Sequence, residues 1–191
     1  MRLMRLTRGL MLTAWMLVLP SLTAQLASAP ASKVYLWLEG ESMGPILGEV
    51  ITPGREDSHS VLAYSHEIVA PYDAASGLPT GKRQHQPFRV VKLLNRGSPR
   101  LVEALATNER LTYVRFDVWA PNLTGKESRL LTYELHIARL ISVRPWMPNK
   151  SDAATVTYAP AEEIAFVYQS ITVTFEDGGV TFTDDWVAPV D

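Results

Sequence analysis

Apolar residues recur at every second position through most of the chain after residue 32, and this period constrains the fold more than any other feature. Successive side chains of a β-strand point to opposite faces, whereas a surface helix repeats its apolar residues three and four apart. In the stretch 33–39, Val34, Leu36 and Leu38 share one face, and Tyr35 lies on the other. The pattern predicts strands over residues 33–39, 60–71, 86–94, 111–119, 129–146 and 162–176.

One short segment departs from the alternation and predicts a single helix. Ser98 is a favourable N-cap residue, and Pro99 suits the first helical position. Apolar residues at positions 101, 102 and 105 then form a stripe at helical spacing. We expect the helix to run from about Pro99 to Thr107, with Asn108 ending it.

Several strands and one short helix indicate a mainly β fold, and we predict a small closed β-barrel of two packed antiparallel sheets flanked by that helix. A barrel is favoured because a strand as long as 129–146 otherwise leaves an open edge that templates aggregation. No repeat or low-complexity linker divides residues 32–191, so we expect one domain. Its acidic end, 177–191, is either a loose tail or a short edge strand. The Gly- and Pro-rich stretch 40–60 exceeds an ordinary connection, which predicts a functional or partner-facing loop.

The first 31 residues have the layout of a secretory signal peptide. Arg2, Arg5 and Arg8 precede an apolar run, 9–20, that is too short to span a bilayer, and small residues follow up to Ala31. Cleavage after Ala31 predicts a secreted protein, or a periplasmic one, without a stable membrane anchor. A misassigned start codon upstream of a cytosolic protein stays open as the alternative.

Charge and cysteine content narrow the classes of partner. The chain holds 18 basic and 20 acidic residues, and removing the first 31 leaves 15 basic against 20 acidic, a net charge of −5. Nucleic-acid binding depends on neutralising phosphates, so this balance argues against a nucleic-acid partner. The absence of cysteine excludes disulfides and thiolate chemistry.

We predict no catalytic, cofactor-binding or metal-binding residues, and hence no enzyme. The sequence has no GxSxG elbow and no glycine-rich phosphate loop, and the histidines at 59, 66, 85 and 136 lack ligand spacing. What remains is the polar run GKRQHQPF at 81–88. Four interpretations fit it: a nucleic-acid patch, a catalytic cluster, a solvated loop, or a surface that contacts another protein. Its spacing alone indicates only a polar turn.

That run belongs to a set of segments that resembles a known family. GKRQHQPF, its continuation RVVKLLNRGSPRLVEALATNERL, and the stretches KVYLWLEG, VLAYSHEIVAP and PAEEIAFVYQSITVTF are similar to the haemolysin-coregulated protein (Hcp) family. This family supplies the inner-tube protein of bacterial type VI secretion systems. The resemblance covers about residues 33–176.

The resemblance implies a small β-barrel with one flanking helix, six copies of which close into a ring. Rings stack into a hollow tube inside a contractile sheath, a VgrG-type spike caps the tube, and small effectors ride in its lumen. By the same resemblance the loop 40–60 is a ring-stacking element. The implied subunit interface consists of Gly81, Lys82, Arg83, Gln84, His85 and Phe88.

Two segments depart from the family pattern. The family normally carries no export signal, whereas residues 1–31 look like one, and the stretch MGPILGEVITPGRED after Ser42 matches poorly. A second hypothesis is therefore an exported Hcp-like binding or accessory module that acts in the periplasm or outside the cell.

Overall fold

The computed structural model describes residues 32–122 and 124–186. The predicted signal peptide, residues 1–31, and the last five residues of the predicted tail lie outside these ranges. The elements are β1 (Lys33–Gly40), β2 (Gly44–Pro45), β3 (His59–Ser65), β4 (Ile68–Val69), β5 (Gln84–His85), β6 (Phe88–Leu93), α1 (Ser98–Ala106), β7 (Leu111–Pro121), β8 (Glu127–His136), β9 (Arg139–Trp146), β10 (Ala161–Val167), β11 (Ser170–Phe175) and β12 (Val180–Asp185).

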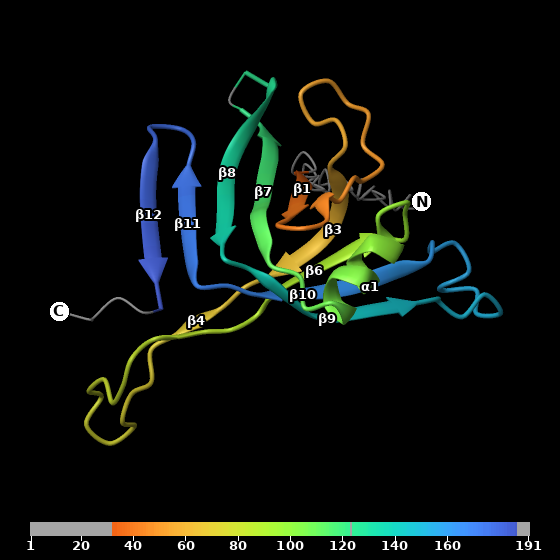
Figure 1. Ribbon diagram of the computed structural model, residues 1–191. Helices are drawn as coiled ribbons and strands as arrows, with labels where there is room; N and C mark the ends of the chain where they lie inside the picture. Colours follow the sequence, from red (N-terminus) through yellow and green to blue (C-terminus); the bar gives the residue numbers. More distant parts are fainter. Residues whose placement is uncertain (1–31, 123, 187–191) are drawn as a thin grey trace, which may run out of the picture.

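Most strands belong to one antiparallel sheet with the order β12-β11-β8-β7-β1-β3-β6-β10-β9. The short β2 pairs with β1, and β4 and β5 form a separate two-stranded ladder. In Figure 1 the strands from β12 to β7 stand side by side, while β6, β10 and β9 run across them. The sheet is therefore strongly bent, and its two halves face each other. The predicted mainly β fold with one flanking helix is confirmed. The predicted closure of the barrel is not seen in the described chain, where the strand path is open and ends at β12 and β9.

The core fills the space between the two halves of the sheet. Phe88 of β6, Phe116 of β7 and Phe166 of β10 are fully buried, and the ring centroids of Phe88 and Phe116 lie 4.4 Å apart. From α1, Leu101 and Ala104 are buried on the face toward the sheet. Of the predicted stripe at 101, 102 and 105, Leu101 is buried and Leu105 is partly buried against the core, whereas Val102 is 50% exposed, so its inclusion was wrong. Burial of this apolar surface is the main force that holds the bent sheet together.

The predicted strand 129–146 is two strands. Ile137 has φ of 52°, a left-handed conformation that no extended strand adopts, and it separates β8 from β9. As a result β8 pairs with β7 and β11 in one half of the sheet, whereas β9 pairs with β10 in the other. The prediction of one continuous strand over 129–146 was wrong.

The predicted strand 162–176 is also divided, into β10 and β11, by Tyr168 and Gln169. β11 then turns through residues 176–179 into β12, which is an edge strand paired with β11 alone in the described chain. The predicted strand 60–71 ends early, because β3 stops at Ser65 and the chain continues into the β4–β5 hairpin. In Figure 1 this hairpin projects from the body at the lower left.

The helix α1 spans Ser98–Ala106, one residue from the prediction at each end. Its N-cap is Gly97 and carries no side-chain cap, so the prediction of Ser98 as the N-cap was wrong. The Ser98 hydroxyl instead donates to Glu162 over 2.7 Å. Asn108 adopts a left-handed conformation with φ of 54° just after the helix, as predicted for a residue that ends it.

The loop between β1 and β3 projects from the body in Figure 1, and backbone hydrogen bonds join its two arms to each other. The Gly48 amide donates to the Asp57 carbonyl over 2.7 Å, and the Val50 amide donates to the Ser58 carbonyl over 3.1 Å. Glu109 accepts from the Ser42 amide and hydroxyl, both over 2.6 Å. Among the described residues, none forms a helix with the length and apolar character needed to cross a bilayer.

Candidate functional site

The predicted interface run 81–88 forms β5 and the start of β6, and its side chains divide between surface and interior. Gly81, Lys82 and Gln84 are exposed. Arg83 is half-buried and His85 is buried. The alternation follows from the strand itself, since neighbouring side chains point to opposite faces.

Arg83 and His85 both bind the same carboxylate of β12. The Arg83 guanidinium donates through Nε to Asp184 Oδ2 over 2.5 Å and through its second amino group to Oδ1, and that group also donates to the Asp185 carbonyl over 3.0 Å. His85 Nε2 lies 2.9 Å from Asp184 Oδ2. The Arg83 guanidinium and then His85 hold the pKa of Asp184 below its usual range, so the carboxylate stays charged.

The contacts continue from His85 to a second histidine. His85 Nδ1 lies 2.9 Å from the Tyr168 hydroxyl, and His66 Nε2 lies 2.5 Å from the same hydroxyl. Tyr168 comes from the segment between β10 and β11, and His66 from the segment between β3 and β4. Asp184, His85, Tyr168 and His66 therefore form one hydrogen-bonded chain, which we call the imidazole chain.

Phe88 lies entirely within the core. Its ring stacks against Tyr64, Phe116 and His66, with centroid distances of 5.7, 4.4 and 5.2 Å. The Phe88 side chain is fully buried within its own chain, so it has no exposed surface on this subunit.

Asp184, Tyr168 and His66 were missed in the sequence analysis. The available signal was charge complementarity, because the acidic pair at 184–185 matches the basic pair at 82–83. A sequence separation of about one hundred residues hides that pairing until the sheet brings β12 beside β5.

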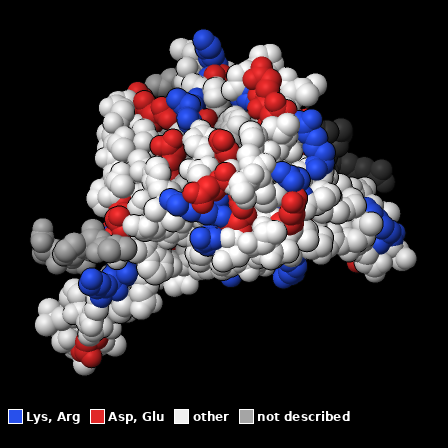
Figure 2. Space-filling view, in the orientation of Figure 1, with Lys and Arg blue, Asp and Glu red and all other residues white. Residues whose placement is uncertain are grey.

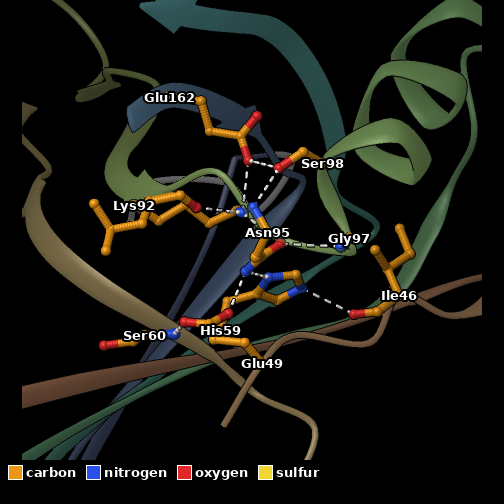
Figure 3. Close-up of polar contacts among 10 residues, drawn as sticks. Ile46, Glu49, His59, Ser60, Lys92, Asn95, Gly97, Ser98 and Glu162 are labelled. Atoms are coloured by element: carbon orange, nitrogen blue, oxygen red, sulfur yellow. Dashed lines mark hydrogen bonds and ion pairs between the residues drawn. The ribbon is translucent and has the colours of Figure 1, made fainter. Parts of the chain in front are cut away.

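A second polar cluster, shown in Figure 3, is buried between β3, β6, β10 and the start of α1. Lys92 Nζ lies 2.6 Å from Glu162 Oε1, and both side chains are almost completely removed from water. Lys92 and the Gly97 amide each donate to Asn95 Oδ1 over 3.0 Å, and the Asn95 amide donates to His59 Nδ1, also over 3.0 Å. The cluster ties these segments together through the Asn95 side chain.

His59 sits at the centre of this cluster as a neutral ring. Its Nε2–H donates to the Ile46 carbonyl over 2.9 Å, which leaves Nδ1 as the acceptor for Asn95. Burial and then the charge of Lys92 lower the pKa of His59 to about 4. Gly97 packs so closely that a Cβ there would lie 2.5 Å from His59 Cε1. Every polar atom of the ring has a partner, so the arrangement is suited to holding the fold and offers no open position for a substrate.

The four histidines are distributed among different contacts. His59 lies in the buried cluster, His66 and His85 in the imidazole chain, and His136 beside Thr172 at 3.2 Å. Within residues 32–122 and 124–186, no group of three or more His, Asp or Glu side chains could hold a metal ion.

Both ends of the strand path expose apolar side chains, and Leu62 of β3, 57% exposed, lies between them. On β12, Val180 and Phe182 are 69% and 67% exposed, and they stand opposite Phe175 and Val173 of β11. At the other end, exposed apolar residues lie on and just after β9; they are Ile141, Trp146 and Met147. Charged residues instead cover much of the face seen in Figure 2. The two apolar surfaces are candidates for contacts with other proteins.

Comparison with known proteins identifies the family. The model for "Type VI secretion system effector, Hcp" matches residues 35–175, most of the described chain. This chain belongs to the Hcp family. The Major exported protein of Pseudomonas aeruginosa is 31% identical over 169 residues, covering 84% of this chain and 98% of that protein. Membership confirms the predicted resemblance and the predicted role as a structural component of type VI secretion.

Solved Hcp structures share the fold. A crystal structure of an Hcp protein aligns with a TM-score of 0.76 at 26% identity, covering 83% of this chain and all of the other. A variant of Hcp1 from the E. coli EAEC 042 pathovar aligns at 0.71 and 30% identity, covering 83% and 99%. The secreted protein Hcp3 from P. aeruginosa aligns at 0.68 and 26% identity, covering 83% and 100%.

Proposed function

We propose that six copies of this chain close into a ring and that rings stack into the tube of a type VI secretion system. The observation that carries the proposal is the pair of apolar surfaces at opposite ends of one strand path, on β12 and on β9. A contact between two different surfaces of identical subunits repeats head to tail, and it closes into a ring when the rotation allows. In such a ring, each subunit places its β12 surface against one neighbour and its β9 surface against the other.

The energetics favour such a contact. Val180 and Phe182 together expose most of their side chains, and covering a side chain of this size contributes about 1.5–3 kcal/mol. An uncovered edge strand with apolar side chains is also an aggregation hazard, which natural proteins remove by covering the edge. Ring closure that covers β12 would bury its apolar side chains and also remove the uncovered edge.

Within this ring, the surface part of the predicted interface run consists of Gly81, Lys82 and Gln84. We place these residues against the neighbouring subunit, where polar contacts set register rather than raw affinity. Arg83, His85 and Phe88 support that segment from within their own chain, through Asp184 and the core.

The β4–β5 hairpin is a second candidate for ring-to-ring contact. Its tip exposes Tyr72 and Leu78 at 69% and 65%, and it projects beyond the body in Figure 1. The loop 40–60, expected from the resemblance to stack rings, also projects from the body, with its two arms joined by backbone hydrogen bonds and Ile51 90% exposed. We propose that both projections take part in contacts between stacked rings.

The proposed partners are those that a tube requires: copies of itself, a contractile sheath around the tube, a VgrG-type spike at its end, and small effectors in the lumen. The role is mechanical, without an enzymatic step or a nucleic-acid partner. The net charge of −5 after residue 31 supports the exclusion of a nucleic-acid partner, because a negatively charged protein repels a polyanion.

A second candidate function is an exported Hcp-like accessory module that works in the periplasm or outside the cell. One observation favours it: residues 1–31 have signal-peptide character and precede the family match, which begins at residue 35. It predicts a product that begins after Ala31 and whose release persists when the type VI machinery is deleted. N-terminal sequencing of the product in both strains separates the two functions, and an intact N-terminus with machinery-dependent release contradicts this one.

Native mass spectrometry of residues 32–191, followed by negative-stain microscopy, tests the ring. We expect hexamers, and we expect Phe182→Ser to shift the population toward monomers because it removes an apolar contact without disturbing the core. Val156→Ser is the matched control, since Val156 is 45% exposed on the loop between β9 and β10. Monomers of the unmodified chain at every concentration, or equal assembly of both variants, would refute the proposed ring contact.

A further inference from the structure

The imidazole chain joins the base of the β4–β5 hairpin to the start of β11 and to β12, two segments that already share a backbone ladder with each other. His66 lies at the base of the projecting hairpin, Tyr168 lies between β10 and β11, and Asp184 lies on the edge strand β12. His85, Tyr168 and Asp184 are all more than nine-tenths buried. At the other end, half-buried His66 borders a surface pocket of about 250 Å³, together with Glu67 and Arg89.

The hydrogen atoms in this chain can be assigned from chemistry. The Asp184 carboxylate only accepts, so His85 Nε2 carries a proton and donates to it. The Nδ1 atom of a neutral His85 then accepts from the Tyr168 hydroxyl, which keeps its proton because burial and the charge of Asp184 raise its pKa. His66 Nε2–H in turn donates to the Tyr168 oxygen. Both rings are thus Nε2–H tautomers when neutral.

The same chain accepts one additional proton without losing a bond. A proton that binds His66 Nδ1 from the pocket lets His66 Nε2 pass its proton to the Tyr168 oxygen. Tyr168 passes its own proton to His85 Nδ1. His66 ends neutral with its proton on Nδ1, Tyr168 ends neutral and donates to His66 Nε2, and His85 ends as a cation beside the Asp184 carboxylate. All three hydrogen bonds remain, with two of them reversed in direction.

A second additional proton cannot bind without the loss of a hydrogen bond. Two imidazolium rings would lie with centroids 6.2 Å apart, and both would donate to one hydroxyl whose own hydrogen then lacks an acceptor. The surrounding charges are Arg83, Asp184 and Asp185 at the buried end and Glu67 and Arg89 at the pocket. Burial first, and His85 second, lower the pKa of His66, in agreement with this geometry.

We propose that His66, Tyr168 and His85 form a one-proton relay that keeps β12 latched to the base of the hairpin while the chain is protonated. The relay stores the proton on His85, where Asp184 neutralises it. It goes beyond the proposed function and depends on it only for its consequence: uptake of one proton leaves unbroken the hydrogen bonds between the hairpin base and the β12 edge that forms the ring contact. A second proton breaks only the link through Tyr168, because Arg83 still binds Asp184 and the β11–β12 ladder is unaffected. The relay itself is a property of one subunit.

Histidine hydrogen exchange followed by mass spectrometry tests the relay, because exchange of the ring Cε1–H reports the titration of each histidine in an assembly of any size. We expect His85 to take up a proton first and His66 to stay neutral until at least about one pH unit lower. Tyr168→Phe removes the hydroxyl that joins His85 to His66. The difference between the titration midpoints of the two histidines is therefore expected to shrink. Tyr158→Phe, which changes an exposed tyrosine, is the matched control and is expected to leave both midpoints unchanged.

A second variant keeps the test decisive if Tyr168→Phe fails to fold. His66→Phe preserves the ring stack on Phe88 but removes the acceptor that Tyr168 needs in the protonated state. The His85 midpoint is therefore expected to fall. Titration of His66 before His85, or midpoints that neither variant moves, overturns the relay. Ring formation, measured separately by native mass spectrometry, shows whether the proposed function has failed independently.

Discussion

Lys92 and Glu162 are a cation and an anion that the fold removes from water almost completely. Burying two charges costs several kcal/mol per ion, and the cost is offset only when each charge has its partner and further hydrogen bonds. Here Asn95 and Ser98 supply those bonds. The pair therefore ties β6 to β10 and to the start of α1, and it makes the structure intolerant of losing one member.

Lys92→Met is expected to lower the free energy of unfolding by about 3–5 kcal/mol, because it leaves Glu162 buried without its cation. The double variant Lys92→Met/Glu162→Leu is expected to recover most of that loss. Arg89→Met is the matched control, since it breaks an exposed ion pair between the same two strands and costs about 1 kcal/mol or less. Denaturant unfolding measures all three, and equal losses for Lys92→Met and Arg89→Met would contradict the role of the buried pair.

His59 makes the stability depend on pH. The folded chain keeps His59 neutral down to about pH 4, whereas the unfolded chain binds a proton near the ordinary value of 6.5. A lowered pKa in the folded state means that this contribution is complete above about pH 6.5 and is lost as the pH falls toward 4. Between pH 7 and 4.5 we expect His59 to account for a loss of about 2 kcal/mol.

Unfolding curves at pH 7 and 4.5 check this, with His59→Gln as the comparison. The variant is expected to be less stable at both values and to show a smaller difference between them. A difference equal to that of the unmodified chain would place the pH dependence elsewhere.

At the scale of the elements, Ile137 decides where one long apolar segment divides. A β-branched residue with φ of 52° is strained, typically by about 1–3 kcal/mol. The strain is tolerated because the turn lets β8 stay in one half of the sheet and β9 enter the other, with the Leu111 amide donating to the Ala138 carbonyl over 2.9 Å across the corner. The break at Ile137 is therefore what allows the sheet to bend at this point.

Ile137→Gly is expected to raise the free energy of unfolding by about 1 kcal/mol, since glycine adopts this conformation without a steric cost. Ile141→Gly, at a similarly exposed position within β9, is expected to lower it because glycine weakens a strand. Thermal or denaturant unfolding of the two variants gives opposite signs if the strain is located at residue 137, and the same sign if it is not.

At the scale of the whole molecule, subunits of equal charge must come together. Each copy carries a net charge of −5 after residue 31, so association works against electrostatic repulsion, and the proposed contacts on β12 and β9 are apolar. Salt shortens the range of that repulsion, from about 10 Å at 0.1 M to about 3 Å at 1 M. Salt also leaves apolar burial intact.

Raising the salt concentration from 0.1 to 1 M is therefore expected to strengthen ring assembly, as measured by analytical ultracentrifugation over a concentration series. Lys82→Gln is expected to alter this trend only slightly, because Lys82 is a polar contact beside the apolar one. Rings that dissociate at high salt would show that charge pairs, rather than the β9 and β12 surfaces, dominate the contact.

The sequence by itself determined which segments are extended, the position of α1 and the family, because each depends on a local period or a contiguous motif. It did not determine where the segments 60–71, 129–146 and 162–176 are interrupted. Alternation places Leu36 and Phe116 on the core face wherever the strand goes, and Pro99 and Asn108 mark the helix ends by their own backbone preferences. Tertiary structure alone decided the division at Ile137, the pairing of Lys92 with Glu162, and the chain from Asp184 to His66. These features depend on which distant strands become neighbours. The free energy that favours this pairing comes from contacts throughout the core, and no single segment contains it.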